Sequence, residues 1–360
     1  MRGQKSFDIV SEIRERFAVL KTEYLVLAII FTIVVLLFLP NSFSSETKYV
    51  VVPKGAGASK ITSILKKEGI IRSKLAFRII LGIRGGTLKA GEYEFSPSMF
   101  PWTVVSVLKS GKISSHSVTI PEGFTVRQIA GLLAEKGLAC EKRILKLCSD
   151  REFIKNTGID AAGLEGYLFP STYFVTRGMT EEDILHMMTK EFKDSWEKSG
   201  LESVLTAKKK KLNEIVKLAS LIEREAETDF DRPLISAVFV NRLKRNMKLE
   251  SCATVVYAYG EKEVQKNRLL GKDLLIESPY NTYLHYGMPP GPICNPGMAS
   301  IKAAVYPAEN KMLFFVLNND GSRSHIFSET KAQHDQAILA SKASKVQGTS
   351  NKVQDNKTIK

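Results

Sequence analysis

Residues 212–226, LNEIVKLASLIEREA, carry the side chain with the clearest potential for chemistry, the carboxyl group of Glu223. At about 100° per residue, the apolar residues of this segment form one face of a helix, and Glu223 projects on to that same face. A carboxyl group held against apolar surroundings is costly to ionise unless it is paired, because desolvation disfavours the charged form. Such a group can give its proton to a leaving oxygen as a general acid. The alternatives are a buried Glu–Arg pair or a helix face that opens on to a wet groove.

The segment PYNTY at residues 279–283 supplies groups suited to binding a sugar. Its rings offer flat apolar faces, and its amide and hydroxyl groups offer hydrogen bonds. We predict that substrate is bound here by Tyr280, Asn281, Thr282 and Tyr283. The alternative is a rigid structural loop. His285 and His325 could assist proton transfer, although a single histidine is more often a satisfied structural residue.

The sequence argues against metal, nucleotide and nucleic-acid chemistry. It contains no CxxC, HExxH, GxxxxGK[ST] or GxGxxG pattern, so we expect no metal site and no metal or organic cofactor. The formal net charge of +14 favours an anionic neighbour such as membrane lipid or an acidic polymer. The positive charge is spread along the chain, and the run at residues 208–211 is typical of a solvated helix face. We therefore expect no nucleic-acid partner.

The N-terminal region predicts a membrane anchor. Residues 24–43 contain no charged side chain and are long enough for a helix that crosses a bilayer, which needs about 20 residues. Residues 1–23 contain five Lys and Arg residues, against only Lys48 and Lys54 shortly after the span. By the positive-inside rule this predicts a cytoplasmic N-terminus and a single span with the remaining chain outside the cytoplasm. The competing interpretation is a cleavable signal peptide, with small residues near Ser42 and Ser44 as a cleavage site.

An internal repeat follows the predicted span. Residues 51–69 and 119–137 share prolines, glycines and apolar residues at one constant offset, and each copy predicts a short strand, a Pro-x-Gly turn and an amphipathic helix. Further helices are expected at residues 75–83, 102–108, 180–196, 233–244 and 299–306, and strands at 90–97 and 312–318. The fold class is therefore α+β. The small strand-and-helix module of the first copy is similar to carbohydrate-binding LysM modules, and the alternative is a packing scaffold without a ligand.

These elements define the expected organisation. Residues 1–23 form the cytoplasmic N-terminus, 24–43 the transmembrane helix, and 46–117 the LysM-like module. Residues 118–340 form a mixed α+β catalytic domain, with the second repeat copy at 118–160. Residues 341–360 are rich in Lys, Ser, Asn and Gln without apolar periodicity, which predicts a disordered tail.

The motifs resemble those of the YceG-like endolytic murein transglycosylases. The resemblance rests on LEGYLFP-x-TY at 164–173, LAS-x-IE-x-E at 218–225, VFVNRL at 238–243, SPYNTY-x-H-x-G-x-PPGPI-x-NPG at 278–297 and H-x-F at 325–327. It implies a single-pass inner-membrane protein that cuts nascent peptidoglycan strands on the periplasmic side. It also implies a LysM-like region before a catalytic domain, and peptidoglycan synthases or the division and elongation machinery as partners. The catalytic glutamate implied by the resemblance falls on Glu223.

The implied reaction cleaves the β-1,4 bond between N-acetylmuramic acid and N-acetylglucosamine without water. Glu223 would protonate the bridging oxygen and then accept the proton of the muramyl C6 hydroxyl, which closes a 1,6-anhydro ring. One alternative is a two-carboxylate muramidase, with Glu165 as the second carboxylate and a member of the substrate-binding set. Another is a membrane-anchored wall-binding scaffold without catalysis.

Two positions depart from the pattern of the family. Ser171 stands where the family usually has aspartate in LEGYLFPDTY, and Cys252-Ala253-Thr254 replaces its usual Asp-Pro-Thr. Any role that the family gives to those carboxylates is therefore not carried over to this chain.

Overall fold

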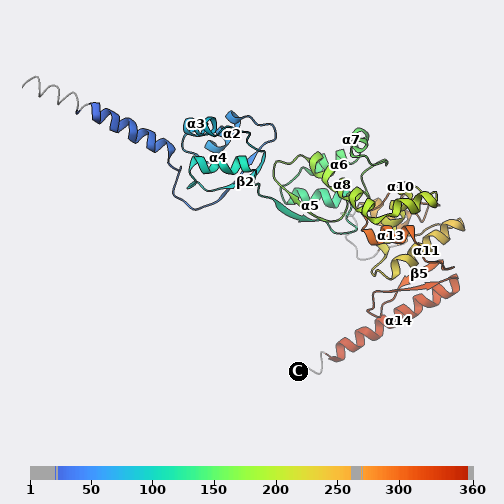
Figure 1. Ribbon diagram of the computed structural model, residues 1–360. Helices are drawn as coiled ribbons and strands as arrows, with labels where there is room; N and C mark the ends of the chain where they lie inside the picture. Colours follow the sequence, from blue (N-terminus) through green and yellow to red (C-terminus); the bar gives the residue numbers. More distant parts are fainter. Residues whose placement is uncertain (1–20, 22, 261–268, 270, 356–360) are drawn as a thin grey trace, which may run out of the picture. The chain divides into compact units, whose positions relative to one another are not determined.

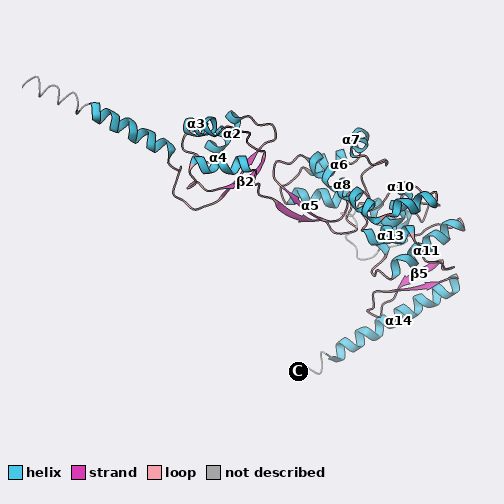
Figure 2. Ribbon diagram, viewed as in Figure 1, coloured by secondary structure: helices cyan, strands magenta, loops and turns pink. Residues whose placement is uncertain are grey.

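The computed structural model describes residues 21, 23–260, 269 and 271–355, with side chains up to residue 344. The chain divides into two compact units (Figure 1). Unit 1 comprises Met1–His116 and Val175–Met179, and unit 2 comprises Ser117–Phe174 and Thr180–Lys360. Helices predominate and the strands are short and paired in twos (Figure 2). The predicted mixture of α and β structure is thus confirmed.

Unit 1 is built around one antiparallel strand pair. Strands β1 (Lys48–Val52) and β2 (Gly91–Phe95) align Val50 with Tyr93, and helices α2 (Ala58–Lys67), α3 (Lys74–Arg84) and α4 (Pro101–Ser110) complete the unit. Val50, Val52, Tyr93 and Phe95 are buried on the core face of the pair, whereas Tyr49 and Glu94 are exposed. That core includes Val50, Val52, Ile61, Leu65, Phe77, Tyr93, Phe95, Val104 and Leu108. The predicted strand, turn and helix of the first repeat copy are confirmed.

One buried carboxylate in unit 1 is fully partnered. Glu92 is 0% exposed and accepts from the Arg177 guanidinium at 3.1 Å and from the Arg177 backbone N–H at 3.2 Å. Nε2 of His116 lies 2.7 Å from the same carboxyl group. A buried charge is tolerated when it is paired and hydrogen-bonded, so this cluster ties residues 175–179 to β2.

Residues 23–38 are helical, and many of their apolar side chains are exposed. Within the described residues, no helix combines the length and the apolar character needed to cross a membrane. Residues 1–20 and 22 of the expected cytoplasmic segment lie outside the described residues.

Unit 2 begins with the second repeat copy. Strand β3 (His116–Thr119) pairs with β4 (Thr172–Val175), and between them lie α5 (Val126–Glu135), α6 (Glu141–Leu147) and α7 (Arg151–Thr157). Helix α5 starts with a capping box, because Thr125 accepts from the Gln128 N–H and the Gln128 side chain accepts from the Thr125 N–H. The strand, Pro-x-Gly turn and helix of this copy are also confirmed.

The centre of unit 2 is a helix enclosed by other helices. Helix α10 (Leu212–Glu225) packs against α11 (Asp231–Lys244), α12 (Cys252–Tyr259) and α13 (Met298–Val305). Consecutive residues around its circumference are buried: Ile215, Val216, Leu218, Ala219, Ser220, Leu221 and Ile222. Glu214 and Arg224 are exposed, so the helix keeps a solvated side, but its buried side is wider than the predicted apolar face and also includes Ser220.

The remaining elements frame this centre. They are α8 (Glu181–Ser199), α9 (Leu201–Ala207), the short 3₁₀ helix η1 (Gly271–Leu275), and the antiparallel strands β5 (Phe314–Leu317) and β6 (His325–Ser328). The helices and the strand predicted from periodicity in this region are found at these places.

The C-terminal segment differs from the prediction. Helix α14 (Lys331–Asp355) continues through residues 341–355, for which the sequence predicted disorder. Its first turns are held in place by buried Ala337 and by Ser341, whose hydroxyl donates to Leu317 O at 2.8 Å. A helix anchored at one end can extend through Lys, Ser and Gln residues without an apolar stripe. Residues 356–360 lie outside the described residues.

Candidate active site

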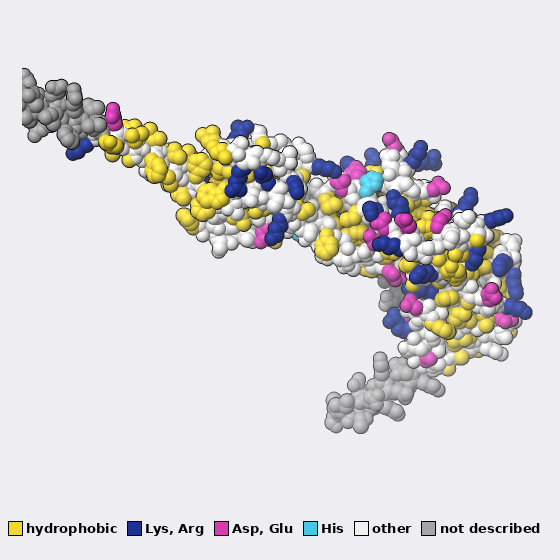
Figure 3. Space-filling view, in the orientation of Figure 1, with side chains coloured by type: hydrophobic (Ala, Val, Ile, Leu, Met, Phe, Trp, Pro, Cys, Tyr) yellow, Lys and Arg dark blue, Asp and Glu magenta, His cyan; other side chains and the backbone are white. Residues whose placement is uncertain are grey.

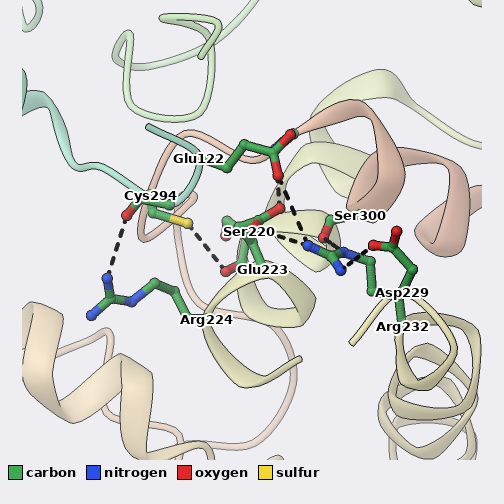
Figure 4. A network of polar contacts seen from close by, with 10 residues as sticks. Glu122, Ser220, Glu223, Arg224, Asp229, Arg232, Cys294 and Ser300 are labelled. Atoms are coloured by element: carbon green, nitrogen blue, oxygen red, sulfur yellow. Dashed lines mark hydrogen bonds and ion pairs between the residues drawn. The ribbon is translucent and has the colours of Figure 1, made fainter. Parts of the chain in front are cut away.

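Glu223 lies in a buried ion pair near the C-terminal end of α10. Its side chain is 7% exposed; Oε1 accepts from Arg232 Nη2 at 3.3 Å and Oε2 accepts from the Gly297 N–H at 3.0 Å (Figure 4). Arg232 also donates to Asp229 Oδ1 at 2.6 Å and to Ser300 Oγ at 3.0 Å. This is the Glu–Arg pair that the sequence left open as the alternative to catalysis. Both carboxyl oxygens are engaged by fixed donors of the protein.

A second carboxyl group, which sequence reasoning missed, lies beside this pair. Glu122 comes from the Pro-x-Gly turn of the second repeat copy, and its Oε2 lies 3.9 Å from Arg232 Nη2. A Cβ atom on Gly297 would come within 1.8 Å of Glu122 Oε1, so any other residue at 297 would displace the Glu122 carboxyl group. Burial and the negative charge of Glu223 raise the pKa of Glu122, while Arg232 opposes the shift. The only signal in the sequence was that Glu122 occupies the place of Lys54 in the first copy.

The last residue of α10, Glu225, faces a different environment. Its Oε1 accepts from Ser251 Oγ at 2.5 Å, and the group lines a cavity of about 350 Å³. We call this the acid cavity; its lining also includes Arg242, Glu250, Cys252, Tyr283, Phe315, His325 and His334. Burial raises the pKa of the Glu225 carboxyl, against the hydrogen bond from Ser251 and the charge of His325. Of the two glutamates, Glu225 is the one that the structure places in a cavity with a raised pKa.

His325 is held in place at the edge of the acid cavity. Its Nδ1 and its backbone N–H each lie 2.9 Å from Asp231 Oδ2, and the Asp231 residue is 1% exposed. The ring meets that of Phe315 edge-on at 5.4 Å between centroids. A carboxylate partner fixes the orientation of an imidazole ring, so His325 presents a defined face near Glu225. His285, the other histidine considered from sequence, is exposed.

The PYNTY segment divides its residues between structure and cavities. Asn281 is 0% and Thr282 2% exposed. The Asn281 amide donates to the carbonyls of Leu274 and Ile276, and Thr282 Oγ1 accepts from the Ser251 N–H at 3.0 Å. These two side chains therefore hold the segment together, as in the rigid-loop alternative.

The two tyrosines of the segment point elsewhere. Tyr283 lines the acid cavity, with its hydroxyl 3.1 Å from Cys252 Sγ. Tyr280 lines a second cavity of about 530 Å³. Burial raises the pKa of the Tyr283 hydroxyl, so it is a neutral donor or acceptor at physiological pH.

Glu165 lies in the second cavity and lines no part of the acid cavity. Its carboxyl group accepts from the Val126 N–H at 3.0 Å, from Asn295 Nδ2 at 3.1 Å and from the Tyr257 hydroxyl at 3.3 Å. The neighbouring Gly166 has φ +90°, and a Cβ there would lie 2.7 Å from Val216, which explains the glycine in the LEGYLFP motif. The structure thus groups Glu165 with Tyr280 and separates it from Glu225.

Comparison with known proteins assigns this chain to a family. The family model described as the YceG-like family matches residues 50–340. The chain belongs to the YceG-like family. It is 35% identical over 312 residues to a Bacillus subtilis protein named endolytic murein transglycosylase, covering 82% of this chain and 84% of that protein.

Two further relatives agree with the YceG-like assignment. A Streptococcus pneumoniae protein of the same name is 29% identical over 329 residues, and the match covers 82% of this chain but only 59% of that longer protein. The crystal structure of a yceG-like protein of Listeria monocytogenes is similar with a TM-score of 0.56 and 33% identity, covering 81% of this chain and 99% of that one.

The position at which this YceG-like chain departs from the expected Asp-Pro-Thr lies in the acid cavity. Cys252 occupies the place of the expected aspartate, and burial raises the pKa of its thiol, as does the nearby Glu225. A neutral thiol beside the Tyr283 hydroxyl adds no negative charge to the cavity. The other departure, Ser171, joins the β3 and β4 region, where its carbonyl accepts from the Ile120 N–H at 2.9 Å.

The chemistry of the described residues includes no built metal centre. Within residues 21, 23–260, 269 and 271–355, no group of three or more His, Cys, Asp or Glu side chains is placed to hold a metal ion. The four cysteines are free thiols, with Cys140 and Cys252 exposed and Cys148 and Cys294 buried.

The raised pKa of Glu225 predicts a pH-dependent stability. A carboxyl group whose pKa is higher in the folded chain binds its proton more tightly there, so its contribution to folding is largest below the unfolded value and falls as pH rises through both values. We expect Glu225→Gln to remove this loss. Urea unfolding should show the variant gaining stability over the wild type at about pH 8 relative to about pH 4. An equal difference at both pH values would contradict a raised pKa.

Proposed function

We propose that this chain is a peptidoglycan lytic transglycosylase that cuts glycan strands internally. Membership of the YceG-like family and two relatives named endolytic murein transglycosylase support the reaction class. The observation that carries the proposal is a single buried carboxyl group, Glu225, in a cavity that it shares with Tyr283 and the oriented His325.

The acid cavity suits a reaction that needs a proton donor and then a proton acceptor. Burial raises the pKa of the Glu225 carboxyl, which favours its protonated form. In the proposed reaction, Glu225 protonates the oxygen that bridges C1 of N-acetylmuramic acid to the following N-acetylglucosamine, and the C1–O bond breaks. The muramyl C6 oxygen then bonds to C1, and its proton passes to the Glu225 carboxylate. The acid is regenerated without water.

Glu223 is the other candidate for the general acid, because the sequence analysis predicted it in that role. The donors around it argue for a positioning role, since Arg232 and the Gly297 N–H occupy both of its oxygens. Glu225 accepts from the Ser251 hydroxyl and from the Ala253 backbone, but unlike Glu223 it lines the acid cavity, which is large enough for part of a sugar. We therefore assign proton transfer to Glu225 and propose that Glu223 keeps α10, α11 and residue 297 in register.

A hydrolytic muramidase is the alternative with a distinct product. An inverting hydrolase needs a second carboxylate about 6.5–9.5 Å away to activate water. Glu165, the predicted second carboxylate, lies in the other cavity and is held by three protein donors. Glu250 also lines the acid cavity, but its Oε2 accepts from Arg242 Nη1 at 2.9 Å. The proposed function predicts anhydro ends rather than reducing ends.

Product masses test the reaction directly. Isolated peptidoglycan is digested with the full chain, and the masses of the soluble fragments are recorded. Fragments that end in 1,6-anhydro-N-acetylmuramic acid support the transglycosylase, because they are lighter by one water than hydrolytic products. Reducing ends would support the muramidase. Release of nothing would support a wall-binding scaffold.

We also propose that residues 24–43 anchor the protein in the cytoplasmic membrane, with unit 2 outside the cytoplasm. Exposed apolar side chains crowd the helix at residues 23–38 (Figure 3), and Tyr24 and Phe31 are each 69% exposed. Such a surface is costly in water and favourable in lipid. The full chain should stay in the membrane fraction after a high-salt wash, and a variant lacking residues 1–43 should be released. Retention of the shortened chain would refute this anchor.

Two further proposals concern the binding of glycan by unit 1 and the protein partners of the chain. Along the chain, helices α2 and α3 lie between strands β1 and β2, an order similar to that of LysM modules. We propose that this unit contacts the glycan. Peptidoglycan synthases and the division or elongation machinery are candidate partners for an enzyme acting on nascent strands. Pull-down of unit 1 with purified peptidoglycan tests the first idea, and co-purification in mild detergent tests the second. Absence of each association would refute it.

A further inference from the structure

The second cavity of unit 2 is separate from the acid cavity but shares the PYNTY segment with it. The cavity has a volume of about 530 Å³ and is lined by the start of α5, residues 161–163, the end of α12 and residues 290–292. Tyr280 lines this cavity, and Tyr283, three residues later, lines the acid cavity. Three residues of extended chain span at most about 10 Å. The backbone positions that carry these two lining side chains are therefore close together.

Two tyrosine rings form a rigid corner of the second cavity. The centroids of Tyr257 and Tyr280 lie 4.9 Å apart with the rings inclined at 52°. The Tyr257 hydroxyl donates to Glu165, and the Tyr280 hydroxyl lies so close to Gly291 that a Cβ there would meet it at 2.8 Å. Rings fixed in this way can stack on a flat apolar ligand face without losing much rotational freedom on binding.

The cavity offers fixed hydrogen-bonding groups to a ligand. The Glu165 carboxyl group lies in its lining, and its three protein donors leave it as a fixed acceptor. Burial and the negative charge of Glu165 raise the pKa of the Tyr280 hydroxyl, which is therefore neutral. Arg127 also lines the cavity, so a cationic donor and a fixed carboxylate acceptor are both available to the hydroxyl and N-acetyl groups of a neutral sugar.

We propose that this cavity is a distal saccharide subsite, which binds a neutral N-acetylated sugar unit of the strand whose bond is broken in the acid cavity. The inference rests on the proposed transglycosylase function. Ala161 and Ala162 leave room beside the tyrosine corner, and Ala162 is exposed at its surface. Binding away from the broken bond favours long strands over short ones.

The test fills the cavity and measures binding without turnover. The Glu225→Gln chain is titrated calorimetrically with the hexamer of N-acetylglucosamine. Adding Ala162→Trp should weaken binding about tenfold, the loss expected for a well-packed contact. Ala207→Trp is the matched control, because Ala207 is also exposed and lines neither cavity. Equal affinities of the Ala162→Trp and Ala207→Trp chains would overturn the subsite.

A second variant separates the subsite from the reaction. In the otherwise wild-type chain, Tyr280→Leu should raise the KM for long strands about tenfold while kcat stays within about twofold, because the acid cavity is untouched. A fall in kcat with constant KM would overturn the subsite. If the wild type releases no anhydro ends but hexamer binding still depends on residue 162, the proposed function fails and the subsite stands. If the wild type releases anhydro ends but Ala162→Trp leaves hexamer binding unaltered, the proposed function stands and the subsite fails.

Discussion

Replacing Glu225 with glutamine is expected to lower kcat for peptidoglycan cleavage by about 10²–10⁴, the contribution usual for general acid–base catalysis. The amide is nearly isosteric with the carboxyl group, so the Ser251 contact and the shape of the acid cavity are kept. It carries no transferable proton at neutral pH, so neither protonation of the leaving oxygen nor recovery of the C6 proton can take place. Release of anhydro-ended fragments over time is the measurement.

The matched control is the same substitution two residues earlier. Glu223→Gln should keep kcat within about tenfold of the wild type, because it changes a positioning contact and leaves the proton donor in place. A folded Glu223→Gln chain without activity, together with an active Glu225→Gln chain, would return the acid role to Glu223. Circular dichroism of both variants establishes that each is folded.

Replacing Arg232 with methionine is expected to lower the free energy of unfolding by about 3–5 kcal/mol, the usual cost of breaking a buried ion pair from one side. The Arg232 side chain is 11% exposed and bonds Glu223, Asp229 and Ser300. Without it, the Glu223 carboxylate, 7% exposed, keeps only the Gly297 N–H among these contacts. Urea unfolding of the variant measures the loss.

Two further variants serve as controls for the Arg232→Met measurement. Adding Glu223→Gln to Arg232→Met should restore much of the lost stability, because it removes the unpaired charge. Arg323→Met breaks an exposed pair with Glu227, in which the side chains are 72% and 38% exposed, and should cost less than about 1 kcal/mol. A loss for Arg232→Met as small as that for Arg323→Met would contradict a structural role for the buried pair.

Local patterns predicted much of the secondary structure. The helix expected at residues 212–226 is α10, and the strand, turn and helix of both repeat copies are present. These elements follow from spacings of three to four or of two residues, which a chain segment carries by itself. Residues 341–355 are the exception, because Ala337 and Ser341 anchor α14 through contacts with distant parts of the chain.

The surroundings of Glu223 and Glu225 could not be predicted from the periodicity of the helix alone. The periodicity of α10 placed Glu223 on an apolar face, but the helix is buried around most of its circumference between residues 215 and 222. The side chains of residues 223 and 225 can therefore both contact neighbouring parts of the protein. Which of them is paired and which lines a cavity depends on Arg232, Gly297 and Ser251.

The sequence by itself determined the α+β class, the family motifs and the helix that carries both glutamates, because composition and periodicity are properties of single segments. Only the tertiary structure decided the partner of each side chain. It placed Asn281 and Thr282 inside the loop, Tyr280 with Glu165, and Tyr283 with Glu225. Partners are decided at this level because desolvation and hydrogen bonding depend on groups that lie close in space although they are far apart in the chain.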